Sequence, residues 1–160
     1  MKVKEQKKKR KKVKPGIHRC RYCGGTVSIR HSSEISTALQ DSFLYVCNHY
    51  PECSAYVRIR PGTNIPDGEM ADEHVRSKRS EAHYYFDMLF KKGLMSRDDA
   101  YIWLMRQLCV PRTMAHIKYL SAYDCDFVIE CSLFELRSHG IQISNRTKSK
   151  GVERNEEKAS

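Results

Sequence analysis

The sequence predicts an α+β fold, in which a small three-stranded module at the front of the chain is followed by a three-helix unit. Three observations support this prediction. Two pairs of closely spaced cysteines lie in the first third of the chain, beside short stretches of alternating apolar and polar residues. Three longer stretches with helical periodicity follow, separated by turn residues. Polar, charged segments flank both parts.

The basic charge of the chain is concentrated at its N-terminus. Residues 1–14 contain nine Lys/Arg and one Glu, whereas the other residues contain 20 Lys/Arg and 18 Asp/Glu. We expect residues 1–16 to be a disordered tail until an anionic partner neutralises it. Nucleic-acid phosphates are the predicted partner; a localisation signal, an anionic-membrane contact and a solubility role are alternatives. The predicted tail contacts are Lys7, Lys8, Lys9, Arg10, Lys11 and Lys12.

Four cysteines in the front module predict a metal site. They lie in two pairs, Cys20 with Cys23 and Cys47 with Cys53. A two-residue gap lets a tight turn direct both sulfurs at one cation, and zinc prefers four sulfurs in a tetrahedron. We expect Gly24 and Gly25 to ease this turn by adopting positive φ. Residues 17–60 therefore predict a zinc ribbon with one Zn²⁺, which is structural because four cysteines leave no open coordination position.

Other uses of these cysteines fit the sequence less well. Disulfides need an oxidising compartment, but the chain shows no apolar secretory leader and contains an odd total of seven cysteines. An iron–sulfur cluster also takes four cysteines, but the spacing and the intervening hairpin favour zinc. His18 and His49 lie close enough in sequence to replace a ligand, but with four cysteines present we expect them to be solvated or to surround the site.

Three stretches of the ribbon are strand-like, and the first and third of them alternate between apolar and polar residues, as strands with one buried face do. They are residues 26–30, 43–46 and 55–60. The side chains expected to face inward are Val27, Ile29, Val57 and Ile59, and those expected to face outward are Ser28, Arg30, Arg58 and Arg60.

Outward arginines and nearby tyrosines form a candidate surface for single-stranded nucleic acid. Bases stack on aromatic rings for about 1 to 3 kcal/mol each, while arginines pair with phosphates. The predicted contacts are Arg30, Tyr50, Arg58 and Arg60. Aromatic side chains also fill the core of small zinc modules, so a structural role for Tyr45, Tyr50 and Tyr56 is an equal alternative.

The second half of the chain predicts a helical unit at residues 71–140, after a linker at 61–70 that is rich in turn residues. Capping boxes at Ser96 and Ser121 begin the second and third helices. The polar residues 141–160 predict a C-terminal tail. The expected helices span residues 71–92, 97–109 and 121–137, and they end before Gly93, Pro111 and Gly140.

Apolar residues at helical spacing mark the faces that we expect to be buried. They are Val75, Ala82, Phe86 and Leu89 on the first helix, and Phe127, Val128, Cys131 and Phe134 on the third. The second helix is apolar on most sides, which favours a packed αα-hairpin over a helix-turn-helix that reads a major groove. Cys125 and Cys131 point about 120° apart on the third helix, so we expect no second metal site.

Two parts of the sequence resemble known families. Cys20-Arg-Tyr-Cys23-Gly24, Phe43 and Cys47-Asn-His-Tyr-Pro-Glu-Cys53 resemble the C-terminal zinc ribbons of bacterial type IA DNA topoisomerases. Arg21 stands where those ribbons often have proline, and the insert between the pairs is longer. In topoisomerases such ribbons bind single-stranded DNA, so this resemblance implies a nucleic-acid role.

A second resemblance covers more of the chain, and it implies the fold and the zinc rather than an activity. The sequence is similar to a family of small zinc-finger-containing proteins of bacteria and their phages. The matching segments are Gly62-Thr-Asn-Ile-Pro66, Glu81-Ala-His83, Phe86-Asp87, Gly93-Leu-Met-Ser-Arg97, Ala100-Tyr101 and Trp103-Leu104. It also implies a cytoplasmic location in a bacterial or phage-infected cell, and we expect no membrane partner.

The sequence as a whole predicts a non-enzymatic zinc-finger protein that binds nucleic acid through its basic tail and ribbon. DNA, single-stranded or without sequence preference, is favoured over RNA. No phosphate-cradling loop, nucleophile with a suitable base or open metal position indicates an enzyme. The alternative is an adaptor, in which zinc only stabilises the fold and the helical unit docks a protein partner or a second copy.

Overall fold

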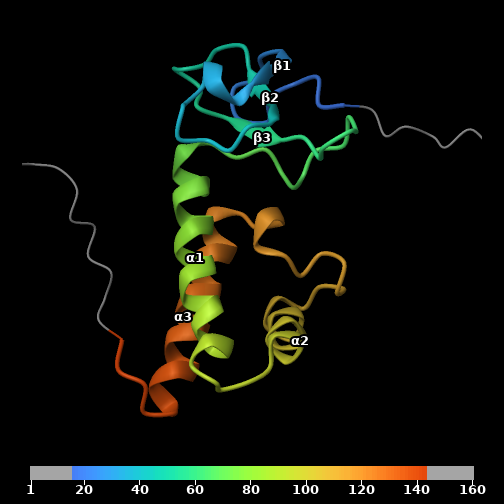
Figure 1. The fold of residues 1–160 in the computed structure, drawn as a ribbon. Helices are drawn as coiled ribbons and strands as arrows, with labels where there is room; N and C mark the ends of the chain where they lie inside the picture. Colours follow the sequence, from blue (N-terminus) through green and yellow to red (C-terminus); the bar gives the residue numbers. More distant parts are fainter. Residues whose placement is uncertain (1–15, 144–160) are drawn as a thin grey trace, which may run out of the picture.

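A computed structural model describes residues 16–143, which form one three-stranded sheet and three α-helices (Figure 1). This architecture confirms the predicted α+β fold. Ile141 and Ile143, which we expected in the C-terminal tail, pack against the core of the helical unit. The predicted tail contacts Lys7, Lys8, Lys9, Arg10, Lys11 and Lys12 lie outside the described residues.

The sheet is antiparallel, with its strands in chain order. β1 is Val27–His31, β2 is Phe43–Cys47 and β3 is Tyr56–Arg58. Arg30 pairs with Leu44, and Leu44 pairs with Arg58, so these three side chains share one face of the sheet. After β3, Ile59 bridges to Pro66, so the predicted linker folds back along the sheet.

One face of the sheet covers the core of the ribbon. Tyr45 and Val57 on this face are 5% and 7% exposed, and they pack with the buried cysteines Cys20 and Cys47. Ile29 shares this face because it pairs with Tyr45, yet it is 49% exposed. The prediction of a buried Ile29 is therefore wrong. Val57 also lies on an edge strand, but it packs into the apolar cluster around Cys20 and Cys47, to which Ile29 does not belong.

α1 is Glu73–Lys91, α2 is Arg97–Leu108 and α3 is Ala122–Ser138, with short 3₁₀ turns η1 at Ser32–Glu34 and η2 at Ile117–Tyr119. α2 and α3 begin at the predicted capping serines and α1 ends before Gly93, whereas α1 begins two residues later than expected and α2 ends at a left-handed Cys109. The hydroxyl of Ser96 accepts the Asp99 amide, and Ser121 forms a full capping box with Asp124. Gly93 adopts a φ of 75° directly after α1.

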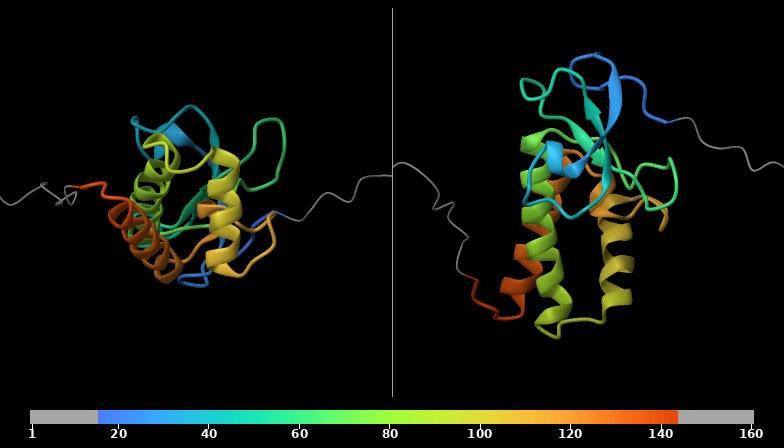
Figure 2. Two further views of the ribbon diagram at one scale, coloured as in Figure 1. Left: turned by 90° about the horizontal axis from the view of Figure 1, so that it is seen from below. Right: turned by 45° about the horizontal axis from the view of Figure 1, so that its top comes forward.

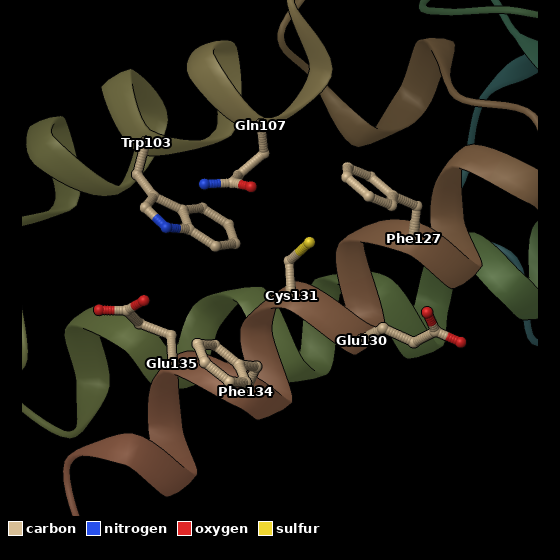
Figure 3. Close-up of a pocket in the computed structure, with 7 residues that line it drawn as sticks. All are labelled: Trp103, Gln107, Phe127, Glu130, Cys131, Phe134 and Glu135. Carbon is tan, nitrogen blue, oxygen red and sulfur yellow. The ribbon is translucent and has the colours of Figure 1, made fainter.

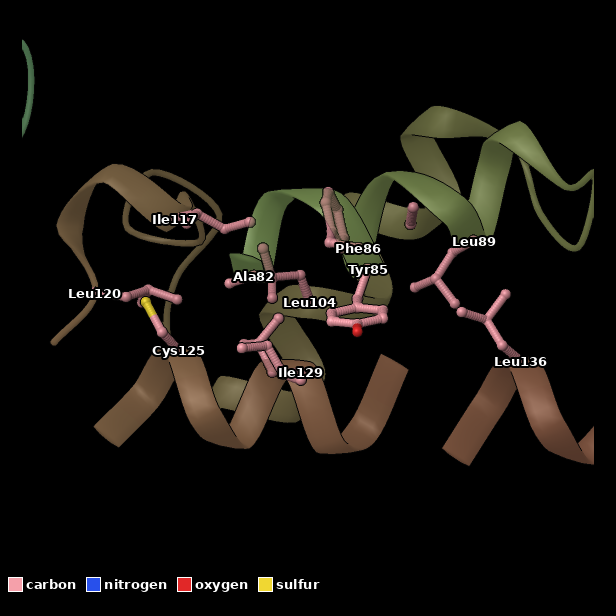
Figure 4. Close-up of a cluster of buried hydrophobic side chains, with 12 residues drawn as sticks. Ala82, Tyr85, Phe86, Leu89, Leu104, Ile117, Leu120, Cys125, Ile129 and Leu136 are labelled. Carbon is pink, nitrogen blue, oxygen red and sulfur yellow. The ribbon is translucent and has the colours of Figure 1, made fainter. Parts of the chain in front are cut away.

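The helical core forms mainly between α1 and α3, which lie side by side, with α2 packed against both (Figures 1 and 2). Figure 4 shows Tyr85 and Leu89 of α1 directed toward α3, where Leu89 lies near Leu136. Phe86 contacts the rings of Tyr101 and Trp103 on α2. The predicted stripe of α1 is confirmed, because Val75, Ala82, Phe86 and Leu89 are all buried.

The predicted stripe of α3 is wrong for most of its length. Of its four residues, Val128 is fully buried, whereas Phe127 and Phe134 are 39% and 73% exposed and Cys131 is half-buried. The face that packs on α1 consists of Cys125, Val128, Ile129, Ser132 and Leu136. Both faces carry apolar residues at helical spacing, so periodicity alone did not identify the buried one.

The sheet lies at the N-terminal end of α1, where polar contacts join the two parts (Figure 1). The Glu73 amide donates to the Ser54 hydroxyl at 2.9 Å, next to Cys53. Arg79 of α1 donates to the carbonyls of Glu69 and Leu120 at 2.8 and 2.9 Å. These bonds connect the ribbon, the linker and the segment before α3. Within the described residues, no helix is both long and apolar enough to cross a membrane.

Candidate metal centre and nucleic-acid interface

The four predicted zinc ligands meet at one point. The Sγ atoms of Cys20 and Cys53 are 3.6 Å apart, those of Cys23 and Cys47 are 3.3 Å apart, and all four lie within 4.8 Å of one another. With zinc–sulfur bonds of about 2.3 Å, neighbouring sulfurs of a regular tetrahedron are about 3.8 Å apart. The four thiols therefore fit one zinc ion, and they form a structural zinc site.

Each thiol also accepts a hydrogen bond from the backbone amide two residues further along the chain. The Tyr22 amide donates to Cys20 Sγ at 3.4 Å. The corresponding donors for Cys23, Cys47 and Cys53 are the amides of Gly25, His49 and Ala55. Such bonds stabilise thiolates, which are the form that binds metal. The turns therefore present four sulfurs already supplied with amide donors.

The exposed Cys23 and the buried Cys47 differ in the pKa of their thiols. Hydrogen bonding by the Gly25 amide, aided by Cys47, lowers the pKa of the exposed Cys23 thiol to about 6. Burial raises the pKa of Cys47 to about 12. A buried thiolate is costly unless a cation compensates it, and zinc supplies that charge when it is bound. The electrostatics of the donor set therefore agree with its geometry.

Gly24 and Gly25 serve the site in different ways. Gly24 has a φ of 72°, as expected, but Gly25 does not adopt positive φ. A Cβ atom on Gly25 would lie 2.9 Å from His49 Cε1 and 3.3 Å from Cys23 Sγ. Gly25 is therefore needed for space. Both His18 and His49 are exposed, and His49 lies beside the site, with Nδ1 3.5 Å from Cys23 Sγ.

The predicted nucleic-acid contacts of the ribbon fall in different environments. Arg30 is half-buried, and it contacts Ser28 and Asn48 at 3.4 Å. Arg58 and Arg60 are exposed, and Tyr50 is half-buried. Arg30 and Arg58 lie in one row across the sheet, whereas Arg60 follows the end of β3 and lies 3.5 Å from Asp67.

Two of the three tyrosines considered for binding have structural contacts. Tyr45 is buried, and its hydroxyl donates to the Asn64 carbonyl at 2.8 Å. The guanidinium carbon of Arg76 lies 3.8 Å from the centre of the Tyr56 ring, so Arg76 occupies one face of that ring. Tyr45 thus belongs to the ribbon core, while Tyr50 stays a predicted contact.

The described residues are electrically neutral as a whole but polarised along the molecule. Residues 16–60 contain five Lys/Arg and three Asp/Glu, whereas residues 61–143 contain ten Lys/Arg and twelve Asp/Glu. Positive charge is therefore greater in the ribbon, which directly follows the basic residues 1–14, and the helical unit has a small negative excess.

A groove between α2 and α3 was missed by sequence reasoning. Its volume is about 370 Å³, and its walls include Trp103 of α2 and Phe127 and Phe134 of α3 (Figure 3). Glu130 and Glu135 lie along it. The sequence analysis places both phenylalanines in the core; the signal against this is the second apolar stripe of α3, at Cys125, Val128, Ile129 and Leu136.

One protein-family model matches the chain. It is described as a zinc-finger-containing domain, and it covers residues 16–133, which include the whole ribbon and most of the helical unit. No curated protein and no solved structure matches the chain. The resemblance of the two cysteine turns to topoisomerase ribbons stays a prediction.

Proposed function

The chain belongs to the family of zinc-finger-containing domains, and we propose that it is a non-enzymatic protein that binds nucleic acid through its basic N-terminal residues and its ribbon. DNA, single-stranded or without sequence preference, is the proposed target. The uneven distribution of charge is the main support. The net charge of +8 over residues 1–14 directly precedes the more basic end of the molecule, and the far end is slightly acidic. A polyanion would therefore approach the ribbon end first.

In this proposal, zinc acts on the fold and not on a substrate. Four thiolates fill the tetrahedral coordination of the ion, so no position remains for an activated water or a substrate atom. When bound, zinc fixes the two cysteine turns, and those turns position the strands that carry Arg30 and Arg58. The bases of a single strand would stack on Tyr50, while the arginines and the N-terminal lysines contact phosphates.

Fluorescence anisotropy with labelled single-stranded and duplex oligonucleotides of equal length tests the proposal. We expect the zinc-loaded protein to bind both, with a log–log salt slope of about −0.7 per phosphate contact on single strands and about −0.9 on duplex. Deletion of residues 1–14 should remove most of that slope. Tyr50→Ala should weaken single-strand binding more than duplex binding, because only unpaired bases stack on a ring.

A matched control for the ring is Tyr123→Ala, since Tyr123 is 80% exposed on α3, in the helical unit. It should leave both affinities unchanged. Failure of the wild-type protein to bind any oligonucleotide at low salt would reject the proposal and favour the adaptor function.

The groove between α2 and α3 supports that second candidate function. Phe134 is 73% exposed and Phe127 is 39% exposed, on the same side of α3, and contiguous exposed apolar surface is typical of docking sites. The carboxylates of Glu130 and Glu135 lie beside these rings. A partner of complementary chemistry is a basic amphipathic helix, whose apolar side would cover the rings and whose Lys or Arg side chains would meet the carboxylates. An isologous contact with a second copy would bring like charges together.

A further inference from the structure

A second hollow, of about 360 Å³, lies where the ribbon meets the helical unit. Six segments of the chain line it: the loop before β2, the strands β2 and β3, the linker, α1 and η2. The residues that matter here are Leu44, Tyr56, Arg58, Asp67, Arg76 and Lys118. Its volume is within the range of about 300 to 1,000 Å³ that is usual for small-molecule sites.

Cations outnumber acids in this hollow. Arg58, Arg76 and Lys118 surround the single carboxylate of Asp67, which Lys118 contacts at 2.7 Å. The hydrogen bond from Lys118, together with the charges of Lys118, Arg60 and Arg58, lowers the pKa of Asp67, so this carboxylate is ionised at neutral pH. It is nevertheless one negative charge among several positive ones.

Two of the cations, Arg58 and Arg76, form no salt bridge with a carboxylate among residues 16–143, although the charge of Arg58 acts on Asp67. Arg58 donates to the side-chain oxygen of Gln40 at 3.1 Å. Arg76 uses Nη1 for the carbonyls of Ser54 and Ala71, at 2.7 and 2.6 Å, and these bonds fix its position. Its Nε and Nη2 donors make no hydrogen bond within the described part of the chain. The hollow thus contains the fixed guanidinium of Arg76, whose Nε and Nη2 donors are available to a ligand, and the exposed guanidinium of Arg58.

The hollow also has an apolar side. Leu44, which is 2% exposed, closes the floor of the hollow, and the half-buried ring of Tyr56, which packs against Arg76, supplies most of the accessible apolar surface. An inorganic anion would use the cations but not this surface. A planar, partly apolar group that bears a phosphate would use both, because bases stack on aromatic and guanidinium planes and arginines bind phosphate through two parallel hydrogen bonds.

We propose that this hollow binds one nucleotide, with its phosphate on Arg58, Arg76 and Lys118 and its base against Leu44 and Tyr56. The nucleotide could be free or part of a strand. The strand-borne form rests on the proposed nucleic-acid function, whereas the free form does not. In a strand, the hollow would fix one nucleotide while the N-terminal residues contact the phosphates around it.

Titration of the full, zinc-loaded chain with AMP, monitored by two-dimensional NMR, tests the site. We expect AMP to shift the amide signals of Tyr56, Arg58, Asp67 and Lys118, and to bind more tightly than inorganic phosphate or adenosine alone. Arg58→Gln should weaken AMP binding about tenfold, because it removes a charge-assisted hydrogen bond. Asp67→Asn should strengthen binding, because it removes the only negative charge of the hollow at nearly constant shape.

Arg106→Gln is the charge-matched control, since Arg106 is exposed on α2 and does not line the hollow. It should leave AMP affinity unchanged. Equal effects of Arg58→Gln and Arg106→Gln, or AMP shifts scattered over the basic surface, would overturn the proposal.

The same variants separate the two sources of the nucleotide. If Arg58→Gln also weakens oligonucleotide binding more than Arg106→Gln does, the hollow receives a nucleotide of the strand. If AMP binds the hollow but no oligonucleotide binds, the proposed site for a free nucleotide is supported and the proposed nucleic-acid function is rejected. If oligonucleotides bind with the expected salt slope but AMP does not bind, the proposed nucleotide site is rejected and the proposed nucleic-acid function is supported.

Discussion

At the scale of the residue, the first zinc turn requires two glycines, Gly24 and Gly25, as well as its cysteines. Gly24 needs backbone freedom, because its φ of 72° is strained for residues with a side chain. Gly25 needs space, because the ring of His49 occupies the position that a Cβ atom would require. The two adjacent glycines therefore meet different structural requirements of the same turn.

Replacing Gly25 with alanine should destabilise the zinc-loaded ribbon by about 1 to 3 kcal/mol, the usual cost of overpacking. A chromophoric chelator in competition for zinc, together with thermal unfolding, measures the effect. His49→Ala in the same chain should restore part of the loss, since it removes the atoms at 2.9 and 3.0 Å. No rescue by His49→Ala would show that the steric account of Gly25 is incorrect.

The zinc ligands could be predicted from the sequence because their spacing is a local property. Cys20 and Cys23 are close whatever the rest of the chain does, and a hairpin is enough to return Cys47 and Cys53 to them. The role of Gly25 could not be predicted in the same way. It depends on where His49, 24 residues later, packs against the first turn.

At the scale of the element, α3 shows the limit of periodicity. It carries one apolar stripe that packs on α1 and a second that lines the groove with Trp103. α1 has a single stripe and was predicted correctly, whereas the choice between the faces of α3 is made by the neighbouring helices. The larger side chains, Phe127 and Phe134, remain on the outer face.

Substitutions on the two faces of α3 should differ sharply in their effect on stability. Leu136→Ala, at a fully buried position, should lower the free energy of unfolding by about 2 to 5 kcal/mol. Phe134→Ser, at a position 73% exposed, should change it by no more than about 0.5 kcal/mol. Urea unfolding of the zinc-loaded protein measures both. A large loss of unfolding free energy with Phe134→Ser and a small one with Leu136→Ala would contradict this assignment and indicate that the stripe predicted from the sequence is the buried one.

At the scale of the whole molecule, the ribbon and the helical unit are joined by specific polar contacts. Arg79 bridges Glu69 of the linker and Leu120, two residues before α3, and Lys118 contacts Asp67 across the same junction. The sequence predicted the boundary between the two parts from its turn residues. It did not predict the hollow at that boundary, because the hollow needs six segments to converge, and their approach is decided by packing between elements.

The account of the whole molecule depends on one zinc ion that holds the two cysteine turns together. Its most direct test is the metal content of the purified full-length protein, prepared under reducing conditions with zinc supplied and measured by native mass spectrometry. We expect one zinc per chain in the wild type and loss of that zinc in Cys47→Ser, because Cys47 is the fully buried ligand. A wild-type protein with less than one equivalent of bound metal would contradict the account.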